Sequence, residues 1–294
     1  MMMNNLSKST IIINLIVDLS TKTPKFPHVL YDKGFHLDML EPRFILPQNK
    51  QNSSAKEVAP DIEINKNNEY LLFFECKYGS ASKDQLDRYK LLTKDDIKRS
   101  HTIELASNEF DFDISYIGMT DKEQKLNISL EDSIDRFPLL ILGNNSVYFS
   151  QNSCKFKMEE LNEIFSNLKI PNDFPRSFIP FTVDDNEEII LEDIIQHFTT
   201  KTGYDFKPYD LLKELLPSMY NYYSQEGQKS LIGRIKNILD KLIMDEDFKE
   251  FITFTNGKYR LDVNEKIKKF HKVCYKFINK YEKNKNQVPL EEFL

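Results

Sequence analysis

Residues 60–77 read PDIEINKNNEYLLFFECK, and this stretch decides the fold of the first half of the chain. Residues 61–64 alternate polar and apolar side chains, which predicts a half-buried strand. Residues 70–77 are rich in aromatic and aliphatic side chains, which also favour a strand. The asparagines between the two runs tolerate the left-handed backbone of tight turns. We therefore predict a β-hairpin whose second strand ends in a Glu-Cys-Lys sequence.

The register of this hairpin decides which charged groups meet. If residues 67–69 form a three-residue loop, Asp61 lies opposite Glu75. Opposed residues in such a pair have Cβ atoms roughly 5 Å apart. Glu75 and Lys77 leave the strand on one face because side chains alternate, whereas the Cys76 side chain points the other way. Two carboxylates and an ammonium group are therefore expected to converge.

Two carboxylates beside an ammonium group suit a hard divalent cation. Mg²⁺ is usually bound through one or two carboxylates, waters and substrate phosphate. Asp61 and Glu75 supply the carboxylates, and the backbone carbonyl of Cys76 is a further candidate ligand. A bound Mg²⁺ or Mn²⁺ activates water and polarises a phosphoryl oxygen. Lys77 is suited to neutralise the developing charge or to orient the water, so the segment indicates metal-dependent cleavage of phosphodiester bonds.

Three short motifs carry a resemblance to a known family: Pro60-Asp61, Glu75-x-Lys77 and Gln85-x-x-Arg88-Tyr89. They resemble the PD-(D/E)xK nuclease superfamily, which includes restriction endonucleases, junction resolvases and transposon-end nucleases. The resemblance covers about residues 55–145. It implies an α/β (α+β) fold, a restriction-endonuclease-like mixed sheet flanked by helices, with metal-bound carboxylates at one edge. It also implies that Gln85 lies near the site and contacts a phosphate or a water.

These motifs also have structural alternatives. The first alternative is a surface hairpin that carries a Glu-Lys pair. It leaves unexplained why three charged groups gather beside an apolar strand, since buried charge is costly unless it is paired or metal-bound. For Gln85, the alternative is a solvated helix face, with Tyr89 packing on the sheet.

A further acidic ligand is expected upstream. Many relatives in the superfamily carry one more acidic residue on a helix before the first motif strand. The candidates in this chain are Asp32, Asp38 and Glu41. We favour Glu41 as an additional metal ligand, and the alternative for each of the three is a surface acid.

Other patterns complete the first domain. Residues 83–93 form a predicted helix capped by Ser82 or Ser80. Further strands are predicted at residues 112–119, 138–142 and 146–149, and a further helix at residues 155–168. The apolar run at residues 11–17 is too short to span a membrane and predicts a buried strand or helix.

Length, cysteines and charge set the outer bounds. The 294 residues accommodate two domains, which we place at residues 1–170 and 181–294. Three widely spaced cysteines fit neither a disulfide framework nor a zinc site, so a reducing cytoplasm is the default setting. The net charge of −6 is uneven, because residues 226–283 carry 14 Lys and Arg against 9 Asp and Glu. Local basic density, more than the total, governs contact with phosphates.

The second domain resembles a winged helix-turn-helix module. Helices are predicted at residues 191–200, 209–223 and 229–244, after a connector punctuated by prolines. Asn256-Gly257 between two β-prone runs is a strong hairpin signal. A long helix at residues 263–282 closes the domain, and the tail after it is either a docking segment or a frayed end.

In that interpretation the third helix and the hairpin contact DNA. The candidate contacts are basic or polar side chains: Lys229, Ser230, Arg234, Lys236 and Lys241 on the helix, with Lys258 and Arg260 on the hairpin. A recognition helix meets the major groove or its phosphates. The alternative is that the winged domain binds another protein.

Together these features predict a Mg²⁺-dependent endonuclease that hydrolyses DNA. Family analogy suggests genome defence, such as restriction of invading or viral DNA, or mobile-element processing. The alternative is a catalytically inactive nuclease-fold protein that binds DNA or serves as a scaffold subunit, and RNA stays open as a substrate. Cutting both strands of a duplex needs two sites or a second event, so a homodimer or a partner protein is expected. No membrane association is predicted.

Overall fold

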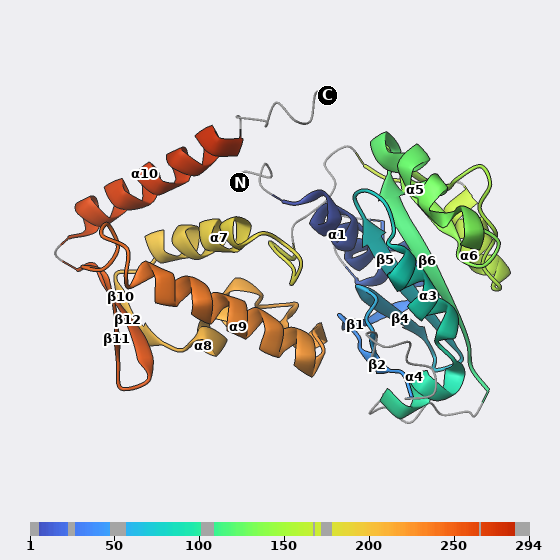
Figure 1. Cartoon of the computed structure of the whole chain (residues 1–294), viewed down its shortest axis with the longest axis horizontal. Coiled ribbons are helices and arrows are strands. Elements are labelled where there is room, and N and C mark those ends of the chain that lie inside the picture. The colour runs from blue at the N-terminus through green and yellow to red at the C-terminus, as the bar shows by residue number, and fades with distance from the viewer. Residues whose placement is uncertain are drawn as a thin grey trace. The chain divides into compact units, whose positions relative to one another are not determined.

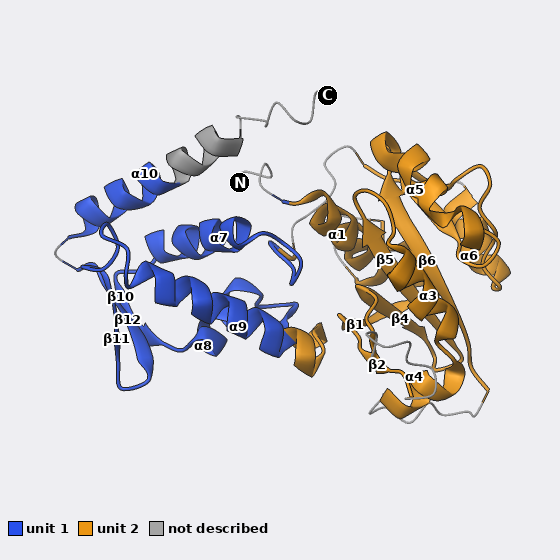
Figure 2. Cartoon of the chain, viewed as in Figure 1, with its two compact units in different colours: residues 1–6, 180–220, 228–294 blue, residues 7–179, 221–227 orange. Residues whose placement is uncertain are grey.

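The computed structural model describes residues 6–22, 27–47, 57–100, 109–166, 168–171, 178–264 and 266–285. It divides the chain into two compact units, which Figure 2 draws in separate colours. The sheet unit holds residues 7–179 together with residues 221–227. The helical unit holds residues 180–220 and 228–294 with the first six residues. Residues 221–227, which the sequence analysis assigned to the second domain, are thus part of the sheet unit.

A seven-stranded mixed sheet forms the centre of the sheet unit (Figure 1). In spatial order its strands are β1 (His36–Leu40), β4 (Ile62–Lys66), β5 (Tyr70–Lys77), β6 (Asp111–Met119), β7 (Leu139–Leu142), β8 (Ser146–Phe149) and β9 (Leu168–Lys169). β5, β6 and β7 run parallel, and the other neighbours pair antiparallel. The expected mixed sheet flanked by helices is confirmed.

The hairpin formed by β4 and β5 has the predicted register. Lys66 faces Tyr70, so residues 67–69 form the three-residue loop. Asn67 and Asn68 have φ angles of 54° and 59°, in the left-handed region that asparagine tolerates better than most residues. The pair of asparagines therefore fixes which residues of the two strands face each other.

Helices cover both faces of this sheet. One face packs under α3 (Lys83–Leu91), α4 (Lys94–Ser100) and α5 (Glu123–Leu130). The core of that face is apolar and includes Leu71, Phe73, Leu86, Tyr89, Ile97, Tyr116, Leu126 and Leu130. The other face packs against α1 (Lys8–Ser20) and α6 (Glu159–Ser166), where the rings of Phe74 and Phe165 are 6.2 Å apart. Alternation along β5 thus sends successive side chains into two separate cores.

Short elements complete the sheet unit. They are α2 (Val29–Asp32), the two-stranded pair β2 (Phe44–Ile45) and β3 (Glu57–Val58), and the 3-10 turns η2 (Thr120–Lys122) and η3 (Glu131–Ser133). The apolar run at residues 11–17 lies inside α1, so the helix alternative was the right one. Among the helices of the described ranges, none combines the length and the apolar character needed to cross a bilayer.

The helix predicted at residues 155–168 is shorter than expected, because α6 begins at Glu159. The side chain of Asn162 explains the late start. Its Oδ1 accepts a hydrogen bond from the Phe156 N–H (2.8 Å), and its Nδ2 donates to the Phe156 carbonyl (3.0 Å). Both backbone groups of Phe156 are therefore satisfied outside a helix.

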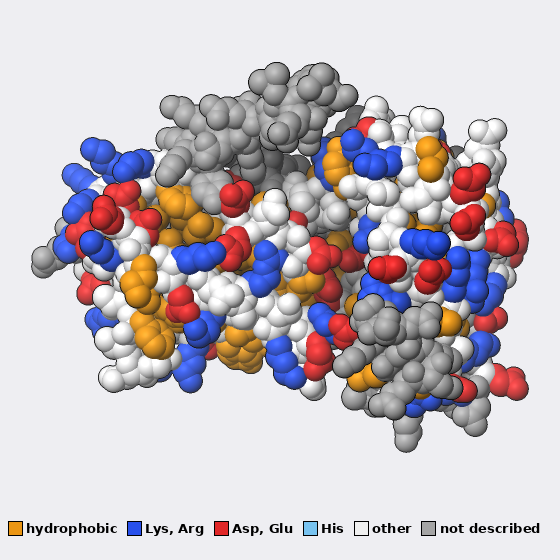
Figure 3. All heavy atoms as spheres, in the orientation of Figure 1, with side chains coloured by type: hydrophobic (Ala, Val, Ile, Leu, Met, Phe, Trp, Pro, Cys, Tyr) orange, Lys and Arg blue, Asp and Glu red, His pale blue; other side chains and the backbone are white. Residues whose placement is uncertain are grey.

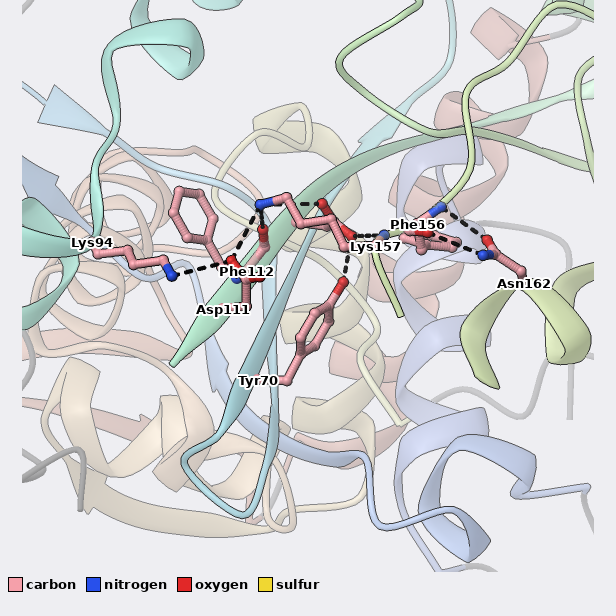
Figure 4. A network of polar contacts seen from close by, with 8 residues as sticks. Tyr70, Lys94, Asp111, Phe112, Phe156, Lys157 and Asn162 are labelled. Carbon is pink, nitrogen blue, oxygen red and sulfur yellow. Dashed lines mark hydrogen bonds and ion pairs between the residues drawn. The ribbon is translucent and has the colours of Figure 1, made fainter. Parts of the chain in front are cut away.

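A polar network ties together the amino ends of β5 and β6 (Figure 4). The Tyr70 hydroxyl donates to Asp113, which also accepts the Lys157 N–H at 2.8 Å. The Lys157 ammonium reaches Asp111 at 3.3 Å and the Phe112 carbonyl at 2.7 Å. Burial raises the pKa values of Tyr70 and Asp113, and each of these two buried side chains has a hydrogen-bond partner in the network.

The helical unit has the predicted order of three helices, a hairpin and a closing helix. Its elements are α7 (Glu187–Thr199), β10 (Gly203–Phe206), α8 (Pro208–Leu215), η4 (Tyr220–Tyr222), α9 (Gln225–Leu242), β11 (Ile252–Thr255), β12 (Lys258–Asp262) and α10 (Ile267–Lys285). Residues 221–227, which include the end of η4 and the start of α9, are counted with the sheet unit. Asn256 and Gly257 turn the hairpin with positive φ angles, as their sequence indicates.

Two features of the helical unit differ from the prediction. β10 was not expected, and it adds a third strand by pairing with β12. The helix predicted at residues 209–223 ends at Leu215 instead. Pro217 accounts for this, since proline disfavours helical backbone in the residue before it and has no N–H to donate.

One buried side chain provides a test of the sheet unit. The Asn14 amide donates to the carbonyls of Thr10 (3.0 Å) and Ile179 (2.7 Å), and its oxygen accepts from the Phe178 and Ile179 N–H groups. Asn14→Ala strips buried backbone groups of these partners, so we expect it to lower the free energy of unfolding by about 2–4 kcal/mol. Denaturant unfolding measures this, with the half-buried Asn127→Ala as control. Equal losses in the two variants would contradict the role given to Asn14.

Candidate active site

Three strand ends bring the predicted site residues together. Asp61 directly precedes β4, Glu75 and Lys77 lie at the end of β5, and Glu41 directly follows β1. The Asp61 N–H donates to the Phe74 carbonyl (3.0 Å), and the Glu41 N–H donates to the Asp61 carbonyl (2.9 Å). Backbone pairing across β1, β4 and β5 therefore places these side chains at one edge of the sheet.

The Asp61 carboxyl is in an unfavourable place for a negative charge. Its Oδ2 accepts the Cys76 N–H at 2.6 Å. Burial raises the pKa of Asp61 well above its ordinary value, and the charges of Glu75 and Glu41 raise it further. Lys77 and the Cys76 amide act in the opposite direction without cancelling the shift. The positive charge beside Asp61 is thus insufficient to favour its ionised form.

Glu75 is 3% exposed and is held on both of its oxygens. The Lys77 ammonium lies 2.6 Å from Oε1, and the Gln85 amide donates to the same oxygen at 2.7 Å. The Tyr89 hydroxyl donates to Oε2 and lies 3.2 Å from the Ala59 carbonyl. Gln85, which the sequence placed near a phosphate or a water, is therefore a direct partner of the Glu75 carboxylate.

The sequence analysis expected Tyr89 only to pack on the sheet and did not predict that its hydroxyl contacts the site. The signal was present, because Gln85 and Tyr89 are four residues apart on α3 and so lie on one face. Its ring packs in the core of the α3 face, as the alternative interpretation expected. Its hydroxyl nevertheless reaches Glu75, and burial with the Glu75 charge raises the pKa of Tyr89, which keeps it a donor.

Glu41 lies at the site, whereas the other two upstream acids do not. Glu41 has a φ angle of 54° and is 7% exposed. It follows a strand and not the helix that the resemblance implied. Asp32 is paired with His28 at 3.3 Å, and Asp38 accepts from Asn65 at 3.0 Å.

Residues 221–227 pack beside Glu41 within the sheet unit. The Ser224 N–H donates to the Leu40 carbonyl at 2.9 Å. A Cβ atom on Gly227 would lie 3.1 Å from the Glu41 Cβ, which is tighter than an ordinary contact. A glycine at this position therefore lets the start of α9 approach the strand end that carries Glu41.

The donor set suits a hard divalent cation. Glu41, Asp61 and Glu75 offer carboxylate oxygens, and one or two such groups are the usual protein contribution to Mg²⁺. In the described ranges, no cluster of three or more His, Cys, Asp or Glu side chains is already arranged to hold a metal ion. A bound cation would favour the ionised form of Asp61, which burial and the charges of Glu75 and Glu41 otherwise disfavour.

The buried Tyr116 adds a polar atom beside this centre. Tyr116 pairs with Glu75 across β5 and β6, and its ring centroid is 6.0 Å from that of Tyr89. Within the described part of the chain its hydroxyl has no hydrogen-bond partner. Burial, with the charges of Glu75 and Asp61, raises the pKa of Tyr116. The hydroxyl is therefore protonated and able to bond a water in the site.

Some of the basic residues expected to bind nucleic acid are instead bonded to other groups of the helical unit. Arg234 donates to the carbonyls of Val183 and Asp185, so its guanidinium serves the fold of the helical unit. Lys236 is paired with Asp240 on its own helix.

The remaining candidates lie at the surface. Arg260 is 3.5 Å from Asp205, and Lys241 is paired with Glu187. Lys229 and Lys258 are exposed. On the face drawn in Figure 3, Lys and Arg side chains are interspersed with Asp and Glu on both units. Lys229 and Lys258, like Lys241 and Arg260, are thus accessible for contact with a phosphate.

Comparison with known proteins places the sheet unit in a family. The model of the MJECL32 domain matches residues 8–179, a range that contains Glu41, Asp61, Glu75 and Lys77. An uncharacterized protein MJECL32 from Methanocaldococcus jannaschii is 30% identical over 169 residues. That match covers 54% of this chain and 37% of the relative, so the chain spans well under half of the relative's length. No solved structure matches. The chain belongs to the MJECL32 domain family.

Proposed function

We propose that the chain is a metal-dependent endonuclease that hydrolyses phosphodiester bonds of DNA, with a PD-(D/E)xK-type core. The observation that carries the proposal is the placement of Glu41, Asp61 and Glu75 at neighbouring strand ends on one edge of the sheet, with Lys77 paired to Glu75. A structural ion pair would need one carboxylate for one ammonium group. Here burial, with the charges of Glu75 and Glu41, raises the pKa of Asp61, and shifted carboxylates of this kind are more frequent at functional sites than elsewhere.

The residues of the site divide the chemistry among them. Glu41, Asp61 and Glu75 would hold Mg²⁺ or Mn²⁺, which would supply an activated water and polarise the phosphoryl oxygen. Lys77 is held by Glu75 at 2.6 Å and is placed to neutralise the charge that develops on the phosphoryl group. Gln85 and Tyr89 hold Glu75 in place, which keeps Lys77 and the carboxylate in fixed geometry.

The helical unit is proposed to bring DNA to the site. Its order of helices, with a strand after the first helix and a hairpin after the third, resembles that of a winged helix-turn-helix and supports this proposal. Analogy with the PD-(D/E)xK superfamily suggests genome defence or mobile-element processing as the setting. A homodimer or a partner protein would allow both strands to be cut. A partner protein is the alternative ligand of the helical unit.

A second candidate function is favoured by one observation. Both oxygens of Glu75 are already occupied by donors of the protein itself. A nuclease-fold protein that binds DNA or serves as a scaffold without cutting it would have this arrangement permanently. Such a protein would bind DNA equally well in EDTA and in Mg²⁺.

Cleavage of DNA is the direct test of the proposal. Supercoiled plasmid, linear duplex and single strands would be incubated with Mg²⁺, Mn²⁺ or EDTA. We expect metal-dependent cutting that falls about 100-fold or more in Glu75→Gln and in Lys77→Ala, because each removes charge from the reacting centre. Lys33→Ala, in the same unit but paired with Glu160 at the surface, is the control. Cutting that persists in both site variants would show that these residues are not the catalytic ones.

The raised pKa of Asp61 predicts an unusual effect on stability. When no metal is bound, the folded protein favours the protonated form of Asp61. The contribution of this preference to the stability of the fold is therefore complete at low pH. That contribution is lost as the pH rises from about 3.8 through the raised pKa of Asp61. Asp61→Asn should therefore raise the melting temperature in EDTA near neutral pH, by about 2–4 °C for each kcal/mol recovered.

Metal should reverse this order of stability. We expect Mg²⁺ or Mn²⁺ to stabilise the wild type by mass action, whereas Asp61→Asn lacks a charged ligand and should respond weakly. Thermal shift with EDTA or metal at several pH values measures both effects. A variant that melts below the wild type in EDTA at every pH would contradict the buried-charge argument.

Contacts in the helical unit predict that its basic residues differ in role. Lys229→Ala combined with Lys258→Ala should weaken DNA binding and reduce its salt dependence, with an unchanged melting temperature. Arg234→Ala should lower the melting temperature, because two carbonyls lose a charged donor. Fluorescence anisotropy at several salt concentrations, with melting curves, separates the two outcomes. Full DNA affinity in the double lysine variant would exclude this surface from DNA binding.

A further inference from the structure

An exposed aromatic ring follows the candidate ammonium group directly. Tyr78 comes immediately after Lys77, at the end of β5, and 41% of its surface is exposed. Successive Cα atoms are about 3.8 Å apart, so the ring begins one residue from the reacting centre. An apolar ring left in water at this position is not explained by packing of the sheet.

The Tyr78 ring is held in place by two side chains. Its hydroxyl donates to Asp121 Oδ2 at 2.9 Å, and the Lys122 ammonium lies 5.1 Å from the ring centroid. Asp121 and Lys122 belong to η2, which follows β6. Because β5 and β6 are parallel, their carboxyl ends meet at the same edge of the sheet. The ring, a cation and the candidate active site therefore share one edge.

The neighbouring backbone is built to keep this arrangement. Gly118 pairs with Lys77, and a Cβ atom on Gly118 would lie 2.6 Å from a methyl carbon of Leu126. A larger residue there would push α5 away from the strand. The Ala81 N–H also donates to the Ser129 hydroxyl at 2.9 Å, which fixes the loop after Tyr78 against α5.

We infer that Tyr78 is a base-stacking residue and that the site takes DNA with an unpaired base beside the scissile phosphate. This inference rests on the proposed nuclease function. An aromatic side chain stacks on any base, whereas the bases of an intact duplex stack on each other. Lys122, beside the ring, is suited to contact the adjacent phosphate. The preferred substrates are therefore single strands, flaps or frayed ends, in preference to continuous duplex.

A held ring is better suited to this role than a mobile one. Ordering a side chain on binding costs free energy, and Asp121 has already restricted the rotation of Tyr78. Tyr78→Phe keeps the stacking face and loses the bond to Asp121, whereas Tyr78→Leu loses the face. The two variants therefore separate stacking from orientation.

Binding in EDTA tests the inference without cleavage. A single-stranded DNA oligonucleotide carrying 2-aminopurine loses fluorescence when that base stacks on an aromatic ring. We expect quenching with wild type, weaker quenching with Tyr78→Phe, and loss of quenching with about ten-fold weaker binding in Tyr78→Leu. Tyr209→Leu is the matched control, since Tyr209 is also 41% exposed and has the Lys213 ammonium 4.4 Å from its ring.

The outcomes test the stacking inference separately from the proposed nuclease activity. Quenching that disappears in Tyr78→Leu and persists in Tyr209→Leu supports stacking, even if no DNA is cut. Equal quenching in wild type and Tyr78→Leu, or no binding of the oligonucleotide, overturns it. If the wild type cuts with metal and Tyr78→Leu keeps the same ratio of single-strand to duplex cleavage, the nuclease stands and the stacking inference fails.

Discussion

Pairing of β4 with β5 is the constraint on which the rest of the structure depends. A shift of one residue would turn every side chain of β5 to the opposite face of the sheet. Glu75 and Lys77 would then enter the core that faces α1 and α6, and Cys76 would replace them at the site. The two asparagines of the loop and the separate apolar cores on each face hold the register against such a shift. Chemistry at the sheet edge is in this way a consequence of ordinary strand packing.

The candidate active site is held together at a cost in stability. Lys77, Gln85 and Tyr89 satisfy Glu75, so this carboxylate is ordered before any ligand binds. The ionised form of Asp61 is less well stabilised, because burial and two neighbouring carboxylates raise its pKa. Natural proteins retain such opposition mainly where function needs it. Glu75 is thus held in place by its partners, whereas the ionised form of Asp61 is disfavoured in the absence of a further positive charge.

Local sequence patterns predicted those parts of the molecule that depend on neighbours along the chain. The hairpin register followed from the asparagine run, and the start of α3 followed from the capping Ser82. The meeting of Asp61, Glu75 and Lys77 followed from the hairpin, whereas the place of Gln85 near them was implied by the resemblance to the nuclease superfamily. By contrast, the position of Glu41 depends on how β1 pairs with β4, which no local pattern reveals. The sequence also offers no spacing that distinguishes Glu41 from Asp32 and Asp38.

Long-range pairing explains the other differences. β10 is a short strand whose partner lies far along the chain, so no local pattern marks it. Arg234 has the sequence context of an exposed basic residue, yet it binds two carbonyls of a distant segment. The contact of residues 221–227 with β1 has the same cause. Because of that contact, the segment matched by the family and the compact structural unit are not the same set of residues. The family match ends at residue 179, but a fragment cut there would leave the backbone of Leu40 without its partner at Ser224. The evolutionary unit is thus continuous in sequence, while the folding unit that contains the site is not.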